Sequence, residues 1–319
     1  MFTFIKPMTK SFFLKRPFLY NIFPRRFSLF KLMLVAVIAS AAFVMLGASL
    51  VSLGSREYFA VSRPVTSYHK VTSFEILNVK LDEQLKPFEP MVTDKEVRIC
   101  QEIFANFSEA MTEASLTFFI YGGSLLGSWR HHNLVPWDDD LDVAVPLSQN
   151  ETMAAVLNRL APNYVLDVRQ KKRWKFYSAQ SIPISRVTWR WPFLDINFYE
   201  GNSTHIWDHD RNYRPFFIPK EEVFPLYKRP FMDMMLPAPR SPESVLKHFY
   251  KMDYCAVGWY DHHDEKMNHN AKSVRCEDLQ HVFPFVQRQP AGGGHVGCNE
   301  SLVFKGDVLA WVVLNTTQC

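Results

Sequence analysis

The sequence predicts an α+β fold, with a mixed or antiparallel sheet and flanking helices, preceded by one N-terminal transmembrane helix. Segments with apolar residues at helical spacing occur among short apolar or alternating runs that are typical of strands. No internal repeat and no low-complexity segment interrupts this mixture. An uncharged apolar stretch, residues 32–55, precedes all of these segments.

The N-terminal segment predicts a membrane anchor. Residues 32–55 carry no charge and, at about 1.5 Å rise per residue, can cross a hydrocarbon core of roughly 30 Å. Residues 1–31 are basic and contain no acidic residue, so this tail should stay cytoplasmic. A cleaved signal peptide is the alternative, although its apolar core would be shorter. We therefore expect a cytoplasmic tail (1–31), a signal anchor (32–55), a stem (56–92) and a luminal catalytic domain (93–319).

Two features beyond the span favour a type II protein of the Golgi or ER membrane. Asn-x-Ser/Thr sequons, typical of glycosylated luminal chains, occur at Asn106, Asn150, Asn202, Asn299 and Asn315. The chain has 5 cysteines, and an odd number in an oxidising lumen leaves at least one free or intermolecular. Cys100 falls within a predicted helix, where we expect a buried core residue.

The charge distribution argues against a nucleic-acid partner. Seven of the 36 lysines and arginines lie in the N-terminal tail, and the 29 that remain are outnumbered by 32 acidic residues. The predicted domain therefore lacks the excess of positive charge that binds polyanions.

The elements of the domain follow in order. Thr93 and Glu96 form a capping box ahead of a helix whose apolar residues run from Val97 to Met111. Ser241 and Pro242 mark the start of the last predicted helix. Between these helices the sequence predicts a strand at 116–123, helical turns at 124–132, a loop at 133–137, a strand at 140–145, a helix at 151–161, strands at 164–170, 175–180, 191–200 and 229–239, and then the helix 241–252.

Aspartates in this pattern predict a metal site. Alternate residues of a strand share a face, so Asp140 and Asp142 point to one side while their apolar neighbours point to the core. Two carboxylates at a partly buried site repel one another unless a cation joins them, and Mg²⁺ or Mn²⁺ suits such oxygen ligands. Asp195, in the middle of an apolar strand, is the expected third ligand.

The residues before these aspartates predict a phosphate-binding turn. Gly122, Gly123 and Ser124 end a strand and open a helical turn, where backbone amides can meet a phosphate. A glycine–serine turn, a strand Asp-x-Asp and a later strand aspartate are together the layout of the nucleotidyltransferase fold. Arg130 is placed to reach a donor diphosphate from the same helix; a surface salt bridge is its alternative role.

Several alternatives stay open at this stage. The aspartates could serve a glycosyltransferase Asp-x-Asp motif or form a purely structural acidic turn; an EF-hand loop is excluded because Val143 and Gln149 occupy its glycine and glutamate positions. The basic residues of 169–175 form either a solvated turn or a lid over phosphates. The histidines of 262–269, flanked by Cys255 and Cys276, form a polar loop or a zinc site, although no standard zinc spacing is present.

The stretch from Gly123 to Asp142, with its Arg-His and Pro-Trp-Asp-Asp-Asp motifs, resembles the signature of the LicD-like family, which includes fukutin and fukutin-related protein. The resemblance continues more weakly over 93–260. It implies transfer of phosphocholine, ribitol phosphate or a related group from a CDP-linked donor to a sugar. This sequence departs from the family pattern at Asn133, a common glycine position, at Asn197, where an aromatic residue is usual, and in lacking a close zinc-binding cysteine cluster.

The sequence therefore predicts a metal-dependent phosphotransferase that moves a phosphorylated alditol, choline-like or sugar group from a nucleotide diphosphate to a glycan hydroxyl. Asp140, Asp142 and Asp195 would hold Mg²⁺ or Mn²⁺, and Asp195 or Asp139 would take the acceptor proton. The alternatives are a Golgi glycosyltransferase and a catalytically inactive luminal partner of such enzymes.

Overall fold

The computed structural model describes residues 68–70, 81–210, 217–291, 297–316 and 319. The chain divides into two units, residues 1–55 and 56–319, and every described residue belongs to the second unit. The predicted tail, the anchor at 32–55 and most of the stem lie outside the described residues. Among the residues that the structure does describe, no helix is both long enough and apolar enough to span a membrane.

The first long helix, α2 (Asp94–Glu113), begins at the predicted capping box. The Thr93 side chain accepts a hydrogen bond from the Glu96 amide, and the Glu96 carboxylate accepts one from the Thr93 amide at 2.7 Å. Four apolar residues of one helix face are fully buried: Ile103, Phe104, Phe107 and Met111. The capping box and the apolar spacing therefore both act as predicted.

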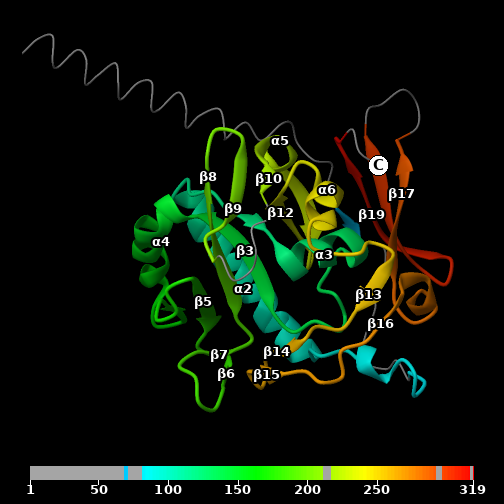
Figure 1. Ribbon diagram of the computed structural model, residues 1–319, viewed down its shortest axis with the longest axis horizontal. Coiled ribbons are helices and arrows are strands. Elements are labelled where there is room, and N and C mark those ends of the chain that lie inside the picture. The colour runs from blue at the N-terminus through cyan, green and yellow to red at the C-terminus, as the bar shows by residue number, and fades with distance from the viewer. Residues whose placement is uncertain (1–67, 71–80, 211–216, 292–296, 317–318) are drawn as a thin grey trace, which may run out of the picture. The chain divides into compact units, whose positions relative to one another are not determined.

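A seven-stranded mixed sheet forms the centre of the domain (Figure 1). Its main path runs β10 (Ile218–Pro219), β9 (His205–Asp208), β8 (Leu194–Gly201), β3 (Leu141–Pro146) and β2 (Phe119–Ile120). Strand β5 (Arg173–Ser178) pairs with β8 and with β4 (Tyr164–Asp167). Only β3 and β8 are paired in parallel within this sheet. The α+β class and the mixed sheet are as predicted.

The parallel pairing of β3 and β8 sets the register on which the site depends. Asp142 lies directly opposite Asp195 in this pair. Apolar side chains on both strands, including Leu141, Val143 and Ile196, are completely buried and hold the two strands in the core. Two aspartates that are far apart in the sequence therefore come to lie side by side.

Short helices cover the sheet and its ends. These are α3 (Gly122–His131), α4 (Asn150–Leu157), α5 (Lys220–Val223) and α6 (Pro242–Lys247), with 3₁₀ turns at Lys86–Phe88, Leu147–Gln149, Asn158–Leu160 and Cys276–Leu279. Helix α3 packs against β3, β11 and α6. Helix α6 starts with Pro242 in its first turn as predicted, but it ends at Lys247 rather than near residue 252.

The predicted strand at 229–239 is wrong, because this segment is a hairpin. Strands β11 (Tyr227–Phe231) and β12 (Met234–Ala238) pair around a two-residue turn. Met232 and Asp233 both adopt positive φ, at 50° and 64°, as the tight turn between antiparallel strands requires. Neither residue is a glycine or asparagine, so the usual turn signal was missing.

The C-terminal third of the chain adds small antiparallel units. Strands β17 (Phe285–Pro290), β18 (Cys298–Phe304) and β19 (Asp307–Leu314) form a second sheet with β1 (His69–Lys70). The remaining pairs are β6 (Ile182–Pro183) with β7 (Arg190–Trp191), β13 (Tyr254–Ala256) with β16 (Ser273–Arg275), and β14 (Tyr260–Asp261) with β15 (Lys266–Met267). Figure 1 shows β17 and β19 beside α3, on the side of the domain away from α4.

Cysteine pairing follows from these units. Disulfides join Cys255 to Cys276 and Cys298 to Cys319, and Cys100 is free and buried on α2. The odd cysteine predicted from the count is therefore the helix residue.

Part of the predicted stem belongs to the folded domain. Leu85 and Phe88 lie in the main core, and Phe88 is fully buried against Trp137. Residues 69–70 extend the second sheet by pairing with β19. These short segments show no periodic pattern of apolar residues, which is why a stem was predicted for them.

A buried charge cluster joins the second sheet to α3. The Glu300 carboxylate accepts hydrogen bonds from Arg229, Arg288 and His132. The Glu300 side chain is only 2% exposed. The neighbouring guanidinium groups lower the pKa of Glu300 despite its burial. Arg229 and Arg288 also stack against the Trp129 ring.

We expect Glu300→Gln to lower the free energy of unfolding by about 3–5 kcal/mol, because it leaves buried guanidinium groups without their counter-charge. Glu277→Gln, which removes an exposed partner of Arg275, is the matched control and should leave stability unchanged. Urea unfolding of the three proteins measures the difference. Equal unfolding midpoints for wild type and Glu300→Gln would contradict this account of the cluster.

Candidate active site

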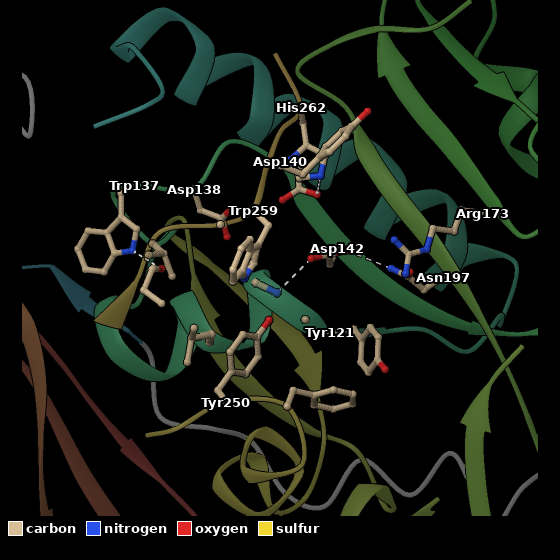
Figure 2. Close-up of a pocket in the computed structure, with 18 of the residues that line it drawn as sticks. Tyr121, Trp137, Asp138, Asp140, Asp142, Arg173, Asn197, Tyr250, Trp259 and His262 are labelled. Atoms are coloured by element: carbon tan, nitrogen blue, oxygen red, sulfur yellow. Dashed lines mark hydrogen bonds and ion pairs between the residues drawn. The ribbon is translucent and has the colours of Figure 1, made fainter. Parts of the chain in front are cut away.

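A cavity of about 640 Å³ lies at the N-terminal end of α3, between the central sheet and the β14 segment. Its polar wall includes Asp138, Asp140, Asp142 and Asn197, and its apolar wall includes aromatic rings from several elements: Tyr121, Trp137, Phe249, Tyr250, Trp259 and Tyr260. Figure 2 shows Asp138, Asp140 and Asp142 around one space, with Trp259 and His262 near them.

Three of the predicted ligands converge beside this cavity. Asp140, Asp142 and Asp195 each offer a carboxylate oxygen, and these oxygens all lie within 4.8 Å of one another. Asp140 and Asp195 are only 7% and 3% exposed. Asp142 and Asp195 come from paired positions of β3 and β8, and Asp140 from the residue just before β3.

The carboxylates disturb one another's ionisation. Burial, reinforced by Asp139 and Asp142, raises the pKa of Asp138 to about 7. Burial also raises the pKa values of Asp140 and Asp142, and in each case Asp195 raises them further. Charged carboxylates at this density are therefore unfavourable without a compensating cation.

The glycine turn makes room for these carboxylates. Gly122 has a φ of +49°, and a Cβ there would lie 2.7 Å from Oδ2 of Asp142. A Cβ on Gly123 would lie 2.4 Å from Oδ2 of Asp138. Side chains at these two positions would therefore displace the aspartates.

The same turn also hydrogen-bonds Asp142. The Gly123 amide donates to Oδ2 of Asp142 at 3.0 Å, and the Asp142 amide donates to the buried Ser124 hydroxyl at 2.8 Å. Gly122 and Gly123 line the cavity, whereas Ser124 does not. The Gly123 amide predicted to meet a phosphate thus bonds the Asp142 carboxylate in this structure.

Asn197, a departure from the family pattern, orients the same carboxylate. It lies on β8, and its Nδ2 donates to Oδ1 of Asp142 at 3.1 Å and to the Val143 carbonyl at 3.3 Å. With the Gly123 amide, both oxygens of Asp142 therefore accept a hydrogen bond from a fixed donor.

Asp195 has a cationic partner that the sequence did not predict. Lys175 on β5 lies 2.6 Å from Oδ1 of Asp195, and its ammonium also faces the Phe193 ring, 3.6 Å from the ring centroid. Both side chains are buried.

Asp139 does not occupy the position predicted for a proton acceptor. Its carboxylate accepts hydrogen bonds from the backbone amides of His262 and His263, at 2.8 and 3.0 Å, and contacts Nδ1 of His262 at 2.8 Å. Asp139 is 2% exposed and does not line the cavity. It therefore fastens the β14–β15 hairpin to the aspartate loop.

Arg130 also lies elsewhere than predicted. Its guanidinium donates to the carbonyls of Met252 and Tyr254, each at 2.9 Å, and the residue is only 6% exposed. Burial lowers the pKa of Arg130 to about 10. It is neither a cavity residue nor a surface salt bridge; it anchors the chain that follows α6.

His262 is the main functional candidate that sequence reasoning left undecided. Its Nδ1 contacts Asp139 and its Nε2 lies 3.4 Å from Oδ2 of Asp140. Burial alone would lower the pKa of His262, but Asp140 and Asp139 outweigh it and raise this pKa to about 11. A charged imidazolium therefore faces the carboxylates. The "WYDHHDE" run that contains His262 was the sequence signal that could have indicated this role.

The cysteines considered for a zinc site are not available as metal ligands. Cys255 and Cys276 are joined in a disulfide, and His263 binds Asp264 at 2.8 Å on the exposed side of the hairpin. The exposed groups Asp261, His263 and Asp264 lie within 4.8 Å of one another, but exposed acidic clusters of this kind are common without a metal. The disulfide instead ties the two ends of the segment that carries the hairpin.

A second cavity of about 620 Å³ adjoins the first and contains the basic residues of 170–175. Lys171, Lys172, Arg173 and Lys175 line it together with Asp195 and Asp210. Lys172 pairs with Asp210 at 2.7 Å. The basic turn is thus part of a cavity wall rather than a fully solvated loop. Arg169, outside the wall, binds Asp167.

We expect Gly123→Ala to lower the free energy of unfolding by about 1–3 kcal/mol, because its Cβ would overlap the Asp138 carboxylate. In an Asp138→Ala background the same substitution should cost less, since the overlapping atoms are gone. Urea unfolding of the four proteins gives the coupling between the two sites. An equal cost in both backgrounds would mean that Asp138 is not the constraint on this glycine.

One family model and several known proteins match parts of this chain. Residues 115–241 match the family model described as LicD/FKTN/FKRP, nucleotidyltransferase domain. An uncharacterized protein of Rickettsia prowazekii is 31% identical over 64 residues, which are 20% of this chain and 23% of that protein. An uncharacterized protein of Rickettsia typhi is 30% identical over 64 residues, 20% of each chain. The alignments thus span under a quarter of these curated relatives.

One solved structure, terminal uridylyl transferase 4 from Trypanosoma brucei with bound GTP, aligns with a TM-score of 0.25 and 10% identity over 38% of this chain and 34% of that chain. The family model covers the glycine turn and all three converging aspartates. Residues 115–241 therefore belong to the LicD/FKTN/FKRP nucleotidyltransferase domain family.

Proposed function

We propose that this protein is a metal-dependent transferase that moves a substituted phosphate group from a CDP-linked donor to a glycan hydroxyl. The observation that carries the proposal is the convergence of Asp140, Asp142 and Asp195 beside the glycine turn, within the family-matched region. Phosphoryl transfer depends on positioning and on stabilising charge, and this arrangement supplies fixed groups for both.

The three carboxylates fit a hard divalent cation such as Mg²⁺ or Mn²⁺. Their oxygens lie within 4.8 Å of one another, and burial, reinforced by repulsion from Asp195, raises the pKa values of Asp140 and Asp142. Lys175 contacts only one oxygen of Asp195. When bound, the cation would neutralise the phosphate oxygens and orient the transferred group.

The first cavity suits the nucleotide part of the donor. Tyr121, Phe249 and Tyr250 supply aromatic faces against which a base or ribose can pack, and Gly122 and Gly123 leave backbone exposed for close approach of a phosphate. Arg173, which lines both cavities, is a guanidinium within reach of a diphosphate.

The proposed transfer needs only the CDP-linked donor and the glycan hydroxyl as reactants. The acceptor oxygen forms a bond to the phosphorus of the substituted phosphate, and the bond from that phosphorus to the bridging oxygen breaks, so that CMP leaves. The acceptor proton passes to a carboxylate. We propose that the Asp195 carboxylate takes this proton, because Asp195 lines the second cavity. The Asp139 carboxylate is instead hydrogen-bonded to the hairpin backbone.

The two alternative functions predict different products. A glycosyltransferase cleaves the bond between sugar and diphosphate and releases a nucleoside diphosphate, whereas phospho-group transfer releases CMP. An inactive partner releases neither. The Golgi or ER location and the type II orientation also remain proposals; the exposed sequon residue Asn202, in the turn between β8 and β9, supports a luminal domain.

The test uses full-length protein with Mn²⁺, microsomal glycoproteins as acceptors, and CDP-choline, CDP-ribitol and UDP-sugars as separate donors. We expect CMP release from a CDP-linked donor, its loss with EDTA and its return with added Mn²⁺. UDP release from a UDP-sugar would favour the glycosyltransferase. No release, together with no metal-dependent binding of CDP, would favour the inactive partner.

Asp140→Asn and Asp142→Asn should each lower CMP release by about 10³-fold or more, because they keep the side-chain shape but remove charge from the cation site. Calorimetry should show the matching loss of Mn²⁺ binding. Asp278→Asn, a change in an exposed 3₁₀ turn, is the control and should retain both. Wild-type activity in either of the two variants would rule out the assigned ligands.

A further inference from the structure

We propose that the second cavity binds the acceptor as a neutral sugar, and that Trp259 is the platform on which the sugar ring stacks. This inference rests on the proposed function and deepens it by assigning the two substrates to separate cavities. Trp259 lies beyond position 241, where the family match ends, whereas the basic wall of the cavity lies within the matched region.

The two cavities meet at the carboxylate cluster. They share four lining residues: Arg173, Trp259, Tyr260 and His262. Asp140 and Asp142 line only the first cavity, whereas Asp195 lines only the second. A phosphorus atom held at the three carboxylates would therefore be open to both cavities.

This arrangement matches the geometry of phosphoryl transfer. The attacking and leaving oxygens lie roughly in line on either side of the phosphorus. A leaving nucleotide in the first cavity thus requires the acceptor hydroxyl to come from a different direction. The second cavity, with a volume of about 620 Å³, has room for a sugar and adjoins the first at the four residues that line both.

Trp259 is exposed at the junction, and its backbone is hydrogen-bonded. It is 74% exposed, more than any other large apolar residue among the described residues. Its carbonyl accepts a hydrogen bond from the Asn268 amide at 2.8 Å, and the Asn268 side chain binds the Gly258 carbonyl. An indole held open to solvent beside a polar cavity is suited to stacking on a ligand ring.

The hairpin that carries Trp259 is fastened on its other side as well. Asp139 binds the backbone of His262 and His263, and Glu265 accepts hydrogen bonds from Tyr260 and from Trp189 at 2.9 and 2.7 Å. The Cys255–Cys276 disulfide closes the segment. The wall is therefore preorganised, which lowers the entropy cost of binding.

The charges of the second cavity favour a neutral, polyhydroxylated ligand. Besides His262, the lining has four basic residues (Lys171, Lys172, Arg173 and Lys175) and three acidic ones (Asp195, Asp210 and Glu265), so it carries little net charge for binding an anionic group. Lys175 pairs with Asp195 and Lys172 with Asp210, and such pairs offer both donors and acceptors to sugar hydroxyls. An aromatic platform beside such a wall matches a sugar with one apolar face and a polar rim.

The test uses full-length wild type, Trp259→Ala, Trp259→Phe and, as a matched control, Phe217→Ala, which removes an exposed aromatic residue that lines neither cavity. Saturation-transfer NMR measures binding of the methyl glycosides of galactose, glucose, mannose, xylose and the two N-acetylhexosamines. Calorimetry measures binding of CDP with Mn²⁺ to the same proteins.

We expect at least one glycoside to bind wild type, Trp259→Phe and Phe217→Ala, and to bind Trp259→Ala at least tenfold more weakly. CDP binding should be equal in wild type and Phe217→Ala, and Trp259→Ala should weaken it less than it weakens glycoside binding, although Trp259 also lines the first cavity. Equal glycoside binding by Trp259→Ala, or no glycoside binding by a wild type that binds CDP with Mn²⁺, would overturn the sugar assignment. Preference for a phosphorylated glycoside over its neutral parent would overturn the neutral-acceptor assignment. Glycoside binding without CDP binding would instead count against the proposed function alone.

Discussion

The constraint on which the site depends is the repulsion among buried carboxylates. Asp138, Asp140, Asp142 and Asp195 gather in one place, where Asp140 and Asp195 are buried and Asp138 and Asp142 are partly buried, and the elements around them limit the cost of their repulsion. Gly122 and Gly123 leave space for the Asp142 and Asp138 carboxylates. The Gly123 amide and the Asn197 side chain donate hydrogen bonds to Asp142. Lys175 contacts Asp195, and His262 contacts Asp140. A divalent cation is the further partner that we propose for this arrangement.

The same constraint explains why the C-terminal third of the chain belongs to the active site. The hairpin at 260–267 brings the His262 imidazolium to Asp140, and it is itself held by Asp139. Asp139 therefore holds the hairpin in place, while Asp138 and Asp140 line the first cavity. The family match ends at residue 241, so this hairpin lies outside the matched region.

Local patterns in the sequence predicted the parts of the fold that local forces determine. The capping box of α2, the α3 turn and the strands β3 and β8 follow from side-chain chemistry and periodicity. An apolar strand with one aspartate was enough to predict that Asp195 would approach Asp142. The hairpin at 227–238 was missed, because Met232 and Asp233 carry no usual turn signal for their positive φ.

Roles that depend on packing between distant segments could not be read in this way. Arg130 lies on the predicted helix but points to the carbonyls of Met252 and Tyr254, and only the path of the chain after α6 determines this. Asp139 sits between two site aspartates in sequence, yet its partners come from residues 262 and 263. Lys175 lies on a strand whose pairing with β8 was not predicted, so its contact with Asp195 was unforeseen.

The central claim is that Asp140, Asp142 and Asp195 hold one divalent cation between the two cavities. Anomalous diffraction from crystals grown with Mn²⁺ and CDP tests it most directly. The account predicts a manganese peak with an oxygen of each of the three aspartates at about 2.0–2.6 Å, and with the CDP phosphates beside it. A manganese ion bound only at the exposed Asp261–Asp264 turn, or a cluster in which Asp195 stays paired with Lys175 and contacts no metal, would contradict it.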